Sequence, residues 1–230
     1  MLPLYDENPT NIVPIGTVFL IGSCVLCWLF IQGGGFSMDM LLSSICNFGT
    51  IPIEITGNSE VAVETSSCQI GGYSWQTLVS SMFLHGSWLH LIGNVWFLWI
   101  FGNNVEGSMG HMRFLLFFLL TGVVATLAHA LSQPTSAIPM VGASGAISGI
   151  MGAYLLLYPR ARIRTLVVLG YAITVTSIPA WMFLGLWALI QLFSSAMTPI
   201  GDVGVAYMAH LGGLSAGMVG VSLFRKPLDR

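Results

Sequence analysis

The sequence predicts an all-α membrane protein, on three observations. Of its 230 residues, 55% are hydrophobic and only 7% are charged, whereas about a quarter of the residues of an ordinary soluble domain are charged. The mean hydropathy is +0.82, and 27 glycines favour close packing between apolar helices. We therefore expect a single membrane domain over residues 1–230. The formal charge of −2 leaves no basic field that would attract nucleic acid.

Six apolar segments are long enough to span a bilayer, since a spanning helix needs about 20 mostly apolar residues. They cover residues 12–31, 88–105, 112–131, 143–158, 179–195 and 205–224. The apolar stretch 165–195 is too long for one span and is interrupted by Pro179, which is unfavourable inside a helix. Its first part is therefore expected to lie along the membrane interface.

The basic residues predict the orientation, because Lys and Arg in short loops stay on the cytoplasmic side. All seven follow the second, fourth or sixth predicted span: Arg113, Arg160, Arg162, Arg164, Arg225, Lys226 and Arg230. Both termini are therefore expected in the cytoplasm. Because no Arg/Ser-rich transit leader precedes the first span, we expect a multi-pass protein of a prokaryotic cytoplasmic membrane.

The outer loop between the first and second predicted spans, residues 34–87, is the one long connection. Segments 51–56 and 60–65 alternate in polarity on either side of Gly57-Asn58, which predicts a short hairpin. Cys46 and Cys68 also lie in this loop, on the side expected to be oxidising. A disulfide between them is a hypothesis, with two free thiols as the alternative.

Polar side chains inside the predicted spans are candidate functional residues, because such groups are costly in a bilayer. His90 and Asn94 lie in the second span, Ser144 near the start of the fourth, and His210 in the sixth. His90, Ser144 and His210 each precede a charged residue at the inner end of their span by 15 or 16 residues, or about 22 to 24 Å at 1.5 Å per residue. The three are therefore expected at one level in the outer third of the membrane.

A serine level with a histidine on another helix can perform nucleophilic catalysis, because the imidazole accepts the hydroxyl proton. We expect a dyad of Ser144 and His210 without a third member, since Asp202 lies in the loop before the last span. His90, Asn94 and the backbone N–H of Ser144 would hold the oxyanion. The spans contain no HExxH motif or carboxylate cluster, so neither a metal nor a cofactor is expected.

Taken singly, each of these residues also fits a structural role, since intramembrane serines bond to their own helix and polar residues join helices. Their shared level and complementary chemistry favour a site. The pairs Gly145/Gly149 and Gly213/Gly217 have the i, i+4 spacing that lets two helices pack closely. The remaining histidines are assigned no catalytic role: His85, His111 and His129.

The chain resembles the rhomboid intramembrane serine proteases in three segments, which are His85-Gly-Ser-Trp-Leu-His90-Leu-Ile-Gly-Asn94, Gly142-Ala-Ser-Gly145 and Ala209-His210-Leu-Gly-Gly213. The resemblance covers nearly the whole chain and implies a six-helix rhomboid-like bundle. It implies that Ser144 is the nucleophile, His210 the base, and His90 and Asn94 the oxyanion-hole side chains. It also implies cleavage of single-pass transmembrane proteins near their outer end, in contact with membrane lipids, and a structural role for Glu106.

Two positions depart from the pattern of some rhomboids. The aromatic residue one turn after the nucleophile is Ser148 here, and the Trp-Arg pair of the outer loop is Trp75-Gln76. Stacking on His210 is therefore expected to be absent or supplied elsewhere. The alternative function is a catalytically inactive rhomboid-like protein that binds membrane clients, which the intact dyad disfavours. A transporter is disfavoured because the polar residues lie away from the midplane. The sequence leaves the substrate and the oligomeric state open.

Overall fold

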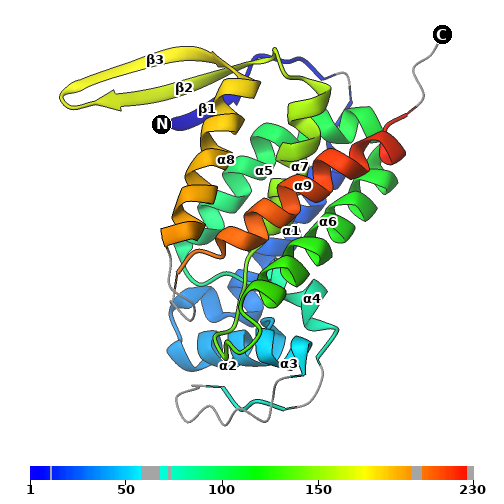
Figure 1. Cartoon of the computed structure of the whole chain (residues 1–230), viewed down its shortest axis with the longest axis vertical. Coiled ribbons are helices and arrows are strands. Elements are labelled where there is room, and N and C mark those ends of the chain that lie inside the picture. The colour runs from blue at the N-terminus through cyan, green and yellow to red at the C-terminus, as the bar shows by residue number, and fades with distance from the viewer. Residues whose placement is uncertain (11, 58–67, 72–73, 198–203, 227–230) are drawn as a thin grey trace.

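The computed structural model describes residues 1–10, 12–57, 68–71, 74–197 and 204–226. Six helices gather in one bundle, with a small sheet at one end and the short helices of the outer loop at the other (Figure 1). The helices of the bundle are α1 (Ile15–Leu26), α5 (Trp88–Met109), α6 (His111–Ser132), α7 (Ser144–Leu157), α8 (Ala180–Met197) and α9 (Tyr207–Phe224). The strands are β1 (Leu2–Asp6), β2 (Arg162–Leu169) and β3 (Ala172–Pro179).

All six segments predicted to span the membrane are helical in the structure. A π-helical turn, η1 (Cys27–Ile31), continues α1. Within the described part of the chain, α6, α8 and α9 are long and apolar enough to cross a membrane, while α1 with η1, and α7, are shorter apolar helices. The count of six spans and the cytoplasmic position of both termini stay predictions.

Helix α7 forms the centre of the bundle. Every residue from Gly145 to Tyr154 is buried, because α5, α6 and α9 all pack against it. The closest approach is to α9, where a methyl group on Gly213 would overlap the carbonyl oxygen of Gly145 and one on Gly217 would overlap that of Gly149. The two helices therefore meet backbone to backbone, in the way that small residues permit in membrane proteins.

Glu106 joins the inner end of α5 to the start of α1. Its side chain is fully buried and accepts hydrogen bonds from the backbone N–H of Gly16 at 2.7 Å and from the N–H and hydroxyl of Thr17 at 2.8 and 2.7 Å. These N–H groups belong to the first turn of α1, where they have no acceptor within the helix and where negative charge is favoured. Glu106 therefore caps α1 from a neighbouring helix.

The all-α expectation is wrong for one region. Strands β2 and β3 form a hairpin, and β1 completes a three-stranded antiparallel sheet in the order β1-β2-β3. That this stretch lies along the membrane interface stays a prediction, which rested on apolar length and on Pro179 and gave the stretch no secondary structure. Its run of β-branched residues, as in Ile173-Thr174-Val175-Thr176, favours strands, and Gly170 at the turn has a φ of 59° that glycine adopts without strain.

The hairpin predicted in the outer loop is also wrong where the structure describes it. Residues Pro52–Thr56 form a short helix, α3, because proline suits the first helical position and Gly57, with a φ of 74°, ends the helix in the left-handed conformation. Ile53 and Glu54 are both buried, so the alternation of polarity did not mark one buried face. The second predicted strand, residues 60–65, lies outside the described residues.

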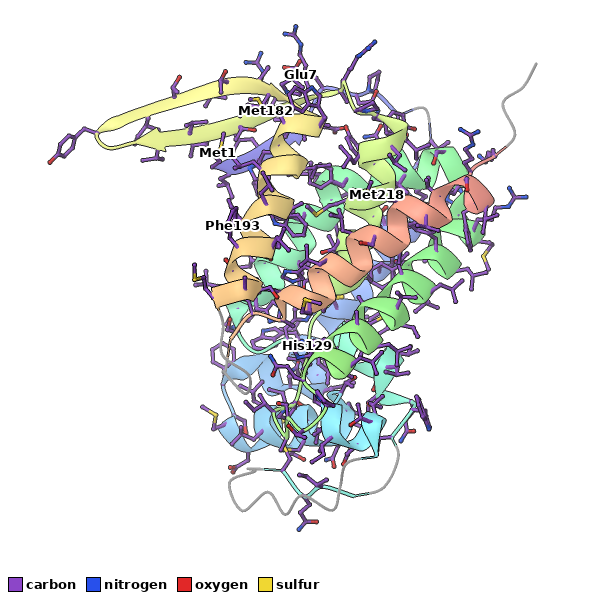
Figure 2. The ribbon with its side chains drawn as sticks, viewed as in Figure 1. Met1, Glu7, His129, Met182, Phe193 and Met218 are labelled. Carbon is purple, nitrogen blue, oxygen red and sulfur yellow. A yellow bond between two sulfur atoms is a disulfide. The ribbon has the colours of Figure 1, made fainter. Side chains whose placement is uncertain are left out.

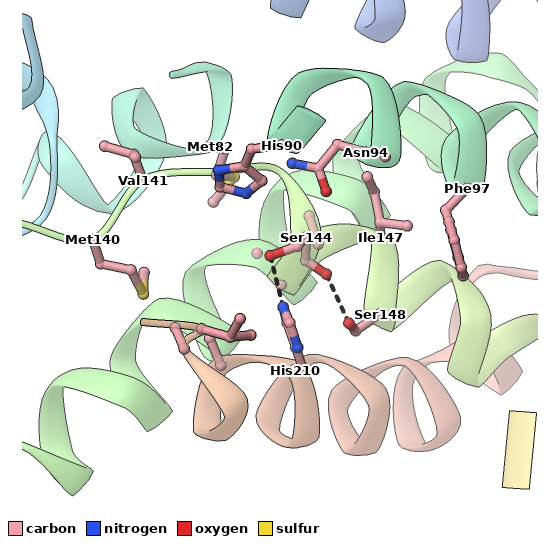
Figure 3. Close-up of a pocket in the computed structure, with 18 of the residues that line it drawn as sticks. Met82, His90, Asn94, Phe97, Met140, Val141, Ser144, Ile147, Ser148 and His210 are labelled. Atoms are coloured by element: carbon pink, nitrogen blue, oxygen red, sulfur yellow. Dashed lines mark hydrogen bonds between the residues drawn. The ribbon is translucent and has the colours of Figure 1, made fainter. Parts of the chain in front are cut away.

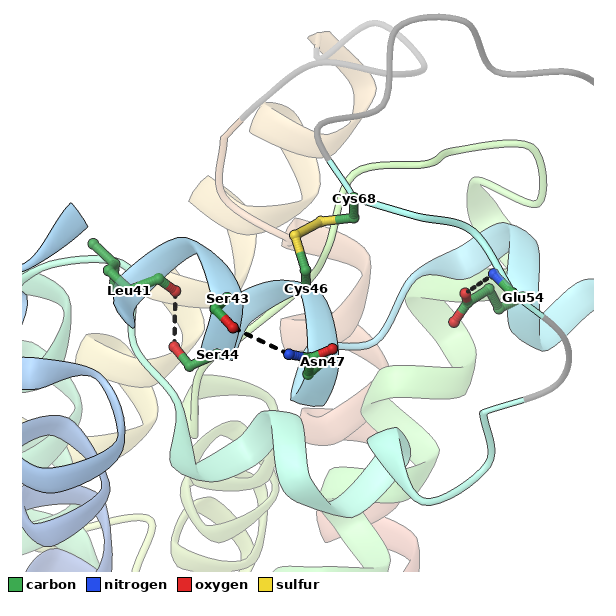
Figure 4. The surroundings of a disulfide bond; sticks show 8 residues. Leu41, Ser43, Ser44, Cys46, Asn47, Glu54 and Cys68 are labelled. Carbon is green, nitrogen blue, oxygen red and sulfur yellow. Dashed lines mark hydrogen bonds between the residues drawn. A yellow bond between two sulfur atoms is a disulfide. The ribbon is translucent and has the colours of Figure 1, made fainter. Parts of the chain in front are cut away.

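The rest of the outer loop contains two further helices, α2 (Met38–Phe48) and α4 (Thr77–Ser80), and the 3-10 turns η2 (Gly33–Gly35) and η3 (Ser81–Phe83). Cys46 on α2 is bonded to Cys68, with their Cα atoms 5.2 Å apart (Figure 4). The disulfide hypothesis is therefore confirmed. Thr50 also exchanges two backbone hydrogen bonds with Met140, at 3.0 and 2.8 Å, which joins the outer loop to the segment that leads into α7.

Candidate active site

Ser144 and His210 lie side by side at the ends of the two most closely packed helices. Ser144 is the first residue of α7, and His210 lies in the first turn of α9. Nε2 of His210 is 2.8 Å from the hydroxyl oxygen of Ser144 (Figure 3). Because Gly145 and Gly213 are in contact on the same two helices, the close packing brings the hydroxyl within hydrogen-bonding distance of the imidazole.

The side chains of His90 and Asn94 converge on Gly142, two residues before the serine. A methyl group on Gly142 would lie 2.6 Å from Nε2 of His90 and 3.5 Å from Nδ2 of Asn94. Asn94 is buried, and its Nδ2 has no hydrogen-bond partner within the described structure. A buried donor without an acceptor is unfavourable, so this amide is available to an oxygen atom that enters the site.

The start of α7 supplies further donors. The first N–H groups of a helix have no acceptor within it, and Ser144 is the first residue of α7. The positive end of the helix dipole therefore points at the same place as the amide of Asn94. These groups can stabilise negative charge on an oxygen bound close to the serine.

A cavity of about 600 Å³ opens in front of these groups. Its wall includes all four predicted polar residues and is otherwise mainly apolar, with side chains from α5, α6, α7, α8 and α9 and from the segment before α7. In Figure 3, Met140 and Val141 lie along that segment, and Phe97 lies beyond Asn94 on α5. The Ser144 hydroxyl and the His210 imidazole therefore lie at the wall of a mainly apolar cavity.

One polar residue of the site was missed by the sequence analysis. Gln191 on α8 is only 7% exposed, and its Oε1 is 2.7 Å from Nδ1 of His210. The imidazole is therefore held from both sides, by Ser144 on Nε2 and by Gln191 on Nδ1. The available signal was that Gln191 is the one amide side chain in the predicted fifth span.

Ser148 provides no aromatic contact to His210, and Trp187 on α8 provides one instead. Trp187, one turn before Gln191 on α8, has its ring centre 5.8 Å from that of His210, with the planes inclined by 36°. The Ser148 hydroxyl instead donates to the backbone oxygen of Ser144 at 2.7 Å, the ordinary contact of an intrahelical serine. An aromatic ring therefore reaches His210 from α8 rather than from α7.

The other histidines lie away from this hydrogen-bonded pair. His85 is buried, and its ring centre is 5.2 Å from that of His90. Nδ1 of His111 is 2.5 Å from Glu106 at the opposite end of the bundle, and His129 contributes to a second, smaller pocket. Asp202, which the sequence analysis excluded from the site, lies outside the described residues.

The fold and the site together define the class of protein. Three helices of the described structure are long and apolar enough to cross a membrane, and the bundle encloses a serine hydrogen-bonded to a histidine. Residues 72–227 match the model of the Rhomboid domain. The chain belongs to the rhomboid family.

Several curated proteins are similar to part of this chain. Rhomboid-like protein 11, chloroplastic, of Arabidopsis thaliana is 34% identical over 157 residues, which are 66% of this chain and 54% of that protein. Rhomboid protease GluP of Bacillus subtilis is 33% identical over 153 residues, 66% of this chain and 27% of the relative. Rhomboid-like protease 5 of Toxoplasma gondii is 34% identical over 146 residues, 62% and 15% respectively. The match thus spans about half of the first relative and less of the other two.

The names of the relatives bear on location. They include chloroplastic and mitochondrial proteins of Arabidopsis thaliana as well as proteins of Bacillus subtilis. Family membership therefore supports an integral membrane protein, and it does not support the narrower expectation of a prokaryotic cytoplasmic membrane.

Proposed function

We propose that the protein is an intramembrane serine endopeptidase that cleaves transmembrane segments of other membrane proteins near their outer end. The observation that carries the proposal is the 2.8 Å contact between Ser144 and His210 at the wall of the cavity. Membership of the rhomboid family and the relatives named as proteases support it. No metal or cofactor takes part in the proposed reaction.

The first step is acylation of the serine. The Ser144 hydroxyl oxygen attacks the scissile carbonyl carbon while its proton moves to Nε2 of His210. The carbonyl oxygen becomes an oxyanion, which the amide of Asn94, the imidazole of His90 and the first N–H groups of α7 stabilise. His210 then gives its proton to the leaving amine, which leaves an acyl group on Ser144.

The second step is hydrolysis of the acyl-enzyme. His210 takes a proton from water, the hydroxyl attacks the acyl carbon, and the same donors stabilise the second oxyanion. When this intermediate collapses, the proton returns to Ser144 and the new carboxyl end is released. The enzyme is regenerated, and the net reaction consumes one water molecule for each peptide bond.

The substrate class follows from the wall of the cavity. Most of its lining is apolar, which suits a segment that leaves the bilayer core, while Gly142, Gly145 and Ala206 leave little bulk near the serine. We therefore propose a single-pass transmembrane protein as substrate, unwound near its outer end so that a peptide bond reaches Ser144. Membrane lipids are the second expected partner.

A covalent probe of activated serines tests the proposal. The purified protein in mild detergent is treated with a fluorophosphonate, alongside Ser144→Ala and His210→Ala. Ser148→Ala is the matched control, because its hydroxyl lies one turn further along α7 and bonds to its own helix. We expect labelling of the wild type and of Ser148→Ala, and none of the other two.

A known active rhomboid serves as the positive control for the same reaction. If that enzyme is labelled and the wild-type protein is not, the proposed activity is wrong and the client-binding alternative takes its place. Cleavage of a transmembrane peptide with a fluorescent label at each end then measures kcat and KM for the variants that react.

A further inference from the structure

We propose that Gln191 is a positioning residue for the reaction: its side-chain oxygen accepts a hydrogen bond from Nδ1–H of His210 and so leaves Nε2 free to take the proton from Ser144. This inference rests on the proposed function, because it concerns how the base of that reaction is oriented. It gives α8 a part in orienting the reacting groups, which α7 and α9 supply.

The two contacts of the ring favour one tautomer of the imidazole. A neutral histidine carries one proton, on Nδ1 or on Nε2, and only an unprotonated Nε2 accepts the serine proton. Oε1 of Gln191, 2.7 Å from Nδ1, is an acceptor and therefore favours the proton on that nitrogen. Nε2 is then left with its lone pair toward Ser144, 2.8 Å away.

The position of Gln191 on α8 supports a specific role. The residues on either side of it, Ile190 and Leu192, are 52% and 55% exposed, whereas Gln191 is 7% exposed. Phe193 likewise points outward from the bundle (Figure 2). An amide that is buried among apolar side chains needs a hydrogen-bonded partner, and His210 provides one.

A second contact from α8 acts on the same ring. Trp187 precedes Gln191 by four residues, so both side chains lie on one face of the helix. The Trp187 ring packs against the imidazole while Gln191 bonds to its edge. Together the two contacts restrict rotation of the ring in its plane and about its Cβ–Cγ bond.

Within the described structure, the group that bonds to Nδ1 of His210 is a neutral amide and not a carboxylate. The titratable side chains that act on it from neighbouring elements of the described structure are His90 on α5 and His129 on α6. No carboxylate in the described ranges bonds to His210. During acylation the Ser144 proton moves to Nε2, and Gln191 keeps its hydrogen bond to Nδ1–H without gaining or losing a proton.

Two variants of Gln191 test the role of its oxygen. Gln191→Met keeps nearly the same shape without a strong acceptor, and Gln191→Glu keeps an acceptor and loses the amide donor. We expect Gln191→Met to lower kcat about tenfold, the loss of one hydrogen bond in the transition state, with KM unchanged and at every pH where the wild type is active. Gln191→Glu should recover kcat to within about threefold of the wild type.

Leu192→Met, on the exposed side of α8, is the matched control and should behave as the wild type. The inference is overturned if Gln191→Met keeps the wild-type kcat, or if Gln191→Glu loses as much as Gln191→Met. Failure of the wild type to cleave would instead overturn the proposed function. The two failures are thus distinguished in one experiment.

A spectroscopic measurement on the wild type avoids any effect of substitution on folding. In protein labelled with ¹⁵N-histidine, the His210 resonances are identified by their absence from His210→Ala. We expect the neutral ring to carry its proton on Nδ1. A proton on Nε2 of the neutral ring would contradict the inference, whatever the kinetics of the variants.

Discussion

Helices α7 and α8 both contact His210, and they are packed in the bundle in very different ways. Helix α7 is buried along ten consecutive residues and meets α9 through backbone contacts at Gly145 and Gly149. Helix α8 buries only Ala180, Phe183, Leu184 and Gln191, and it reaches His210 through one hydrogen bond and one ring contact. In the proposed mechanism, the first helix carries the nucleophile and the second orients the base.

The two kinds of packing determine two different features of the site, a distance and an orientation. The distance between Ser144 and His210 depends on the packing of α7 against α9, which leaves no room for adjustment. The orientation of the imidazole depends on α8, whose remaining side chains face outward along most of its length. Changes where α7 packs against α9 should therefore act on both folding and catalysis, whereas changes on α8 should act mainly on catalysis.

The largest effect is expected from Asn94 on α5, the helix that packs against α7 beside the serine. Asn94→Ala removes an unpartnered donor that faces the cavity, and loss of one oxyanion-hole donor lowers kcat by about 10²- to 10³-fold. Steady-state cleavage of the fluorescent transmembrane peptide measures it. Ile92→Ala is the control, because Ile92 is exposed on the same helix and is not part of the cavity wall; a wild-type kcat for Asn94→Ala would remove Asn94 from the oxyanion hole.

The next largest effect is expected on stability, from one glycine substitution on α9 and one on α8. Gly217→Ala places a methyl group against the carbonyl oxygen of Gly149, and overpacking of this kind costs about 1–3 kcal/mol. Gly185→Ala on α8 meets nothing within 4 Å and should change stability by less than about 1 kcal/mol, in the stabilising direction, because alanine favours the helix. Unfolding in detergent followed by tryptophan fluorescence measures both. Equal effects would contradict the comparison.

A smaller effect is expected from the ring contact on α8. Trp187→Ala removes an aromatic contact worth about 0.5–1.5 kcal/mol, so we expect kcat to fall by about two- to tenfold with KM nearly constant. Trp181→Ala, an exposed residue of the same helix, is the control. If both variants lose the same activity, the effect belongs to α8 as a whole and not to the contact with His210.

The smallest effect concerns the sheet that leads into α8. The Ser177 hydroxyl and Arg164 both donate to Glu7, at 3.0 and 2.5 Å, and these contacts hold the pKa of Glu7 below its usual value, with the Ser177 hydrogen bond as the largest cause. Because the pKa is lower in the folded protein, the stabilisation is present above the ordinary value of 4.5 and is lost as pH falls through the folded pKa.

Glu7→Gln should therefore be slightly less stable than the wild type at neutral pH and should lose less stability on acidification. Unfolding midpoints measured from neutral pH to below 4.5 give the two curves. Arg164→Gln should move the midpoints in the same direction. Parallel curves for Glu7→Gln and the wild type would show that Glu7 contributes nothing to the attachment of the hairpin.

Apolar length predicted the helices well and the sheet badly. A run of about 20 apolar residues fixes the existence of a helix in a bilayer, and all six predicted segments are helical. The same criterion gave no secondary structure for residues 165–178, because a strand can be as apolar as a helix and only its β-branched residues and Gly170 distinguish it. In the outer loop, Pro52 and Gly57 carried a helical signal that the alternation of Ile51, Ile53 and Ile55 concealed.

The sequence predicted those residues of the candidate site that lie at the same depth on helices running in the same direction. Counting residues to the inner charges placed Ser144 level with His210, and the two are in contact in the structure. Gln191 and Trp187 escaped because the fifth predicted span was judged by its length and by Pro179. Their spacing showed that they share a face, but the direction of that face depends on packing that the sequence does not state.

The bond between Cys46 and Cys68 offers a chemical test of the predicted orientation of the chain in its membrane. Disulfides persist in oxidising compartments and are reduced in the cytosol, and this bond lies in the outer loop, at the end of the bundle opposite the sheet (Figure 1). A chain inserted in the reverse direction would expose both thiols to cytosolic reductants. The ratio of bridged to free Cys46, in membranes isolated with a thiol-blocking reagent, therefore measures the fraction of molecules inserted in the predicted orientation.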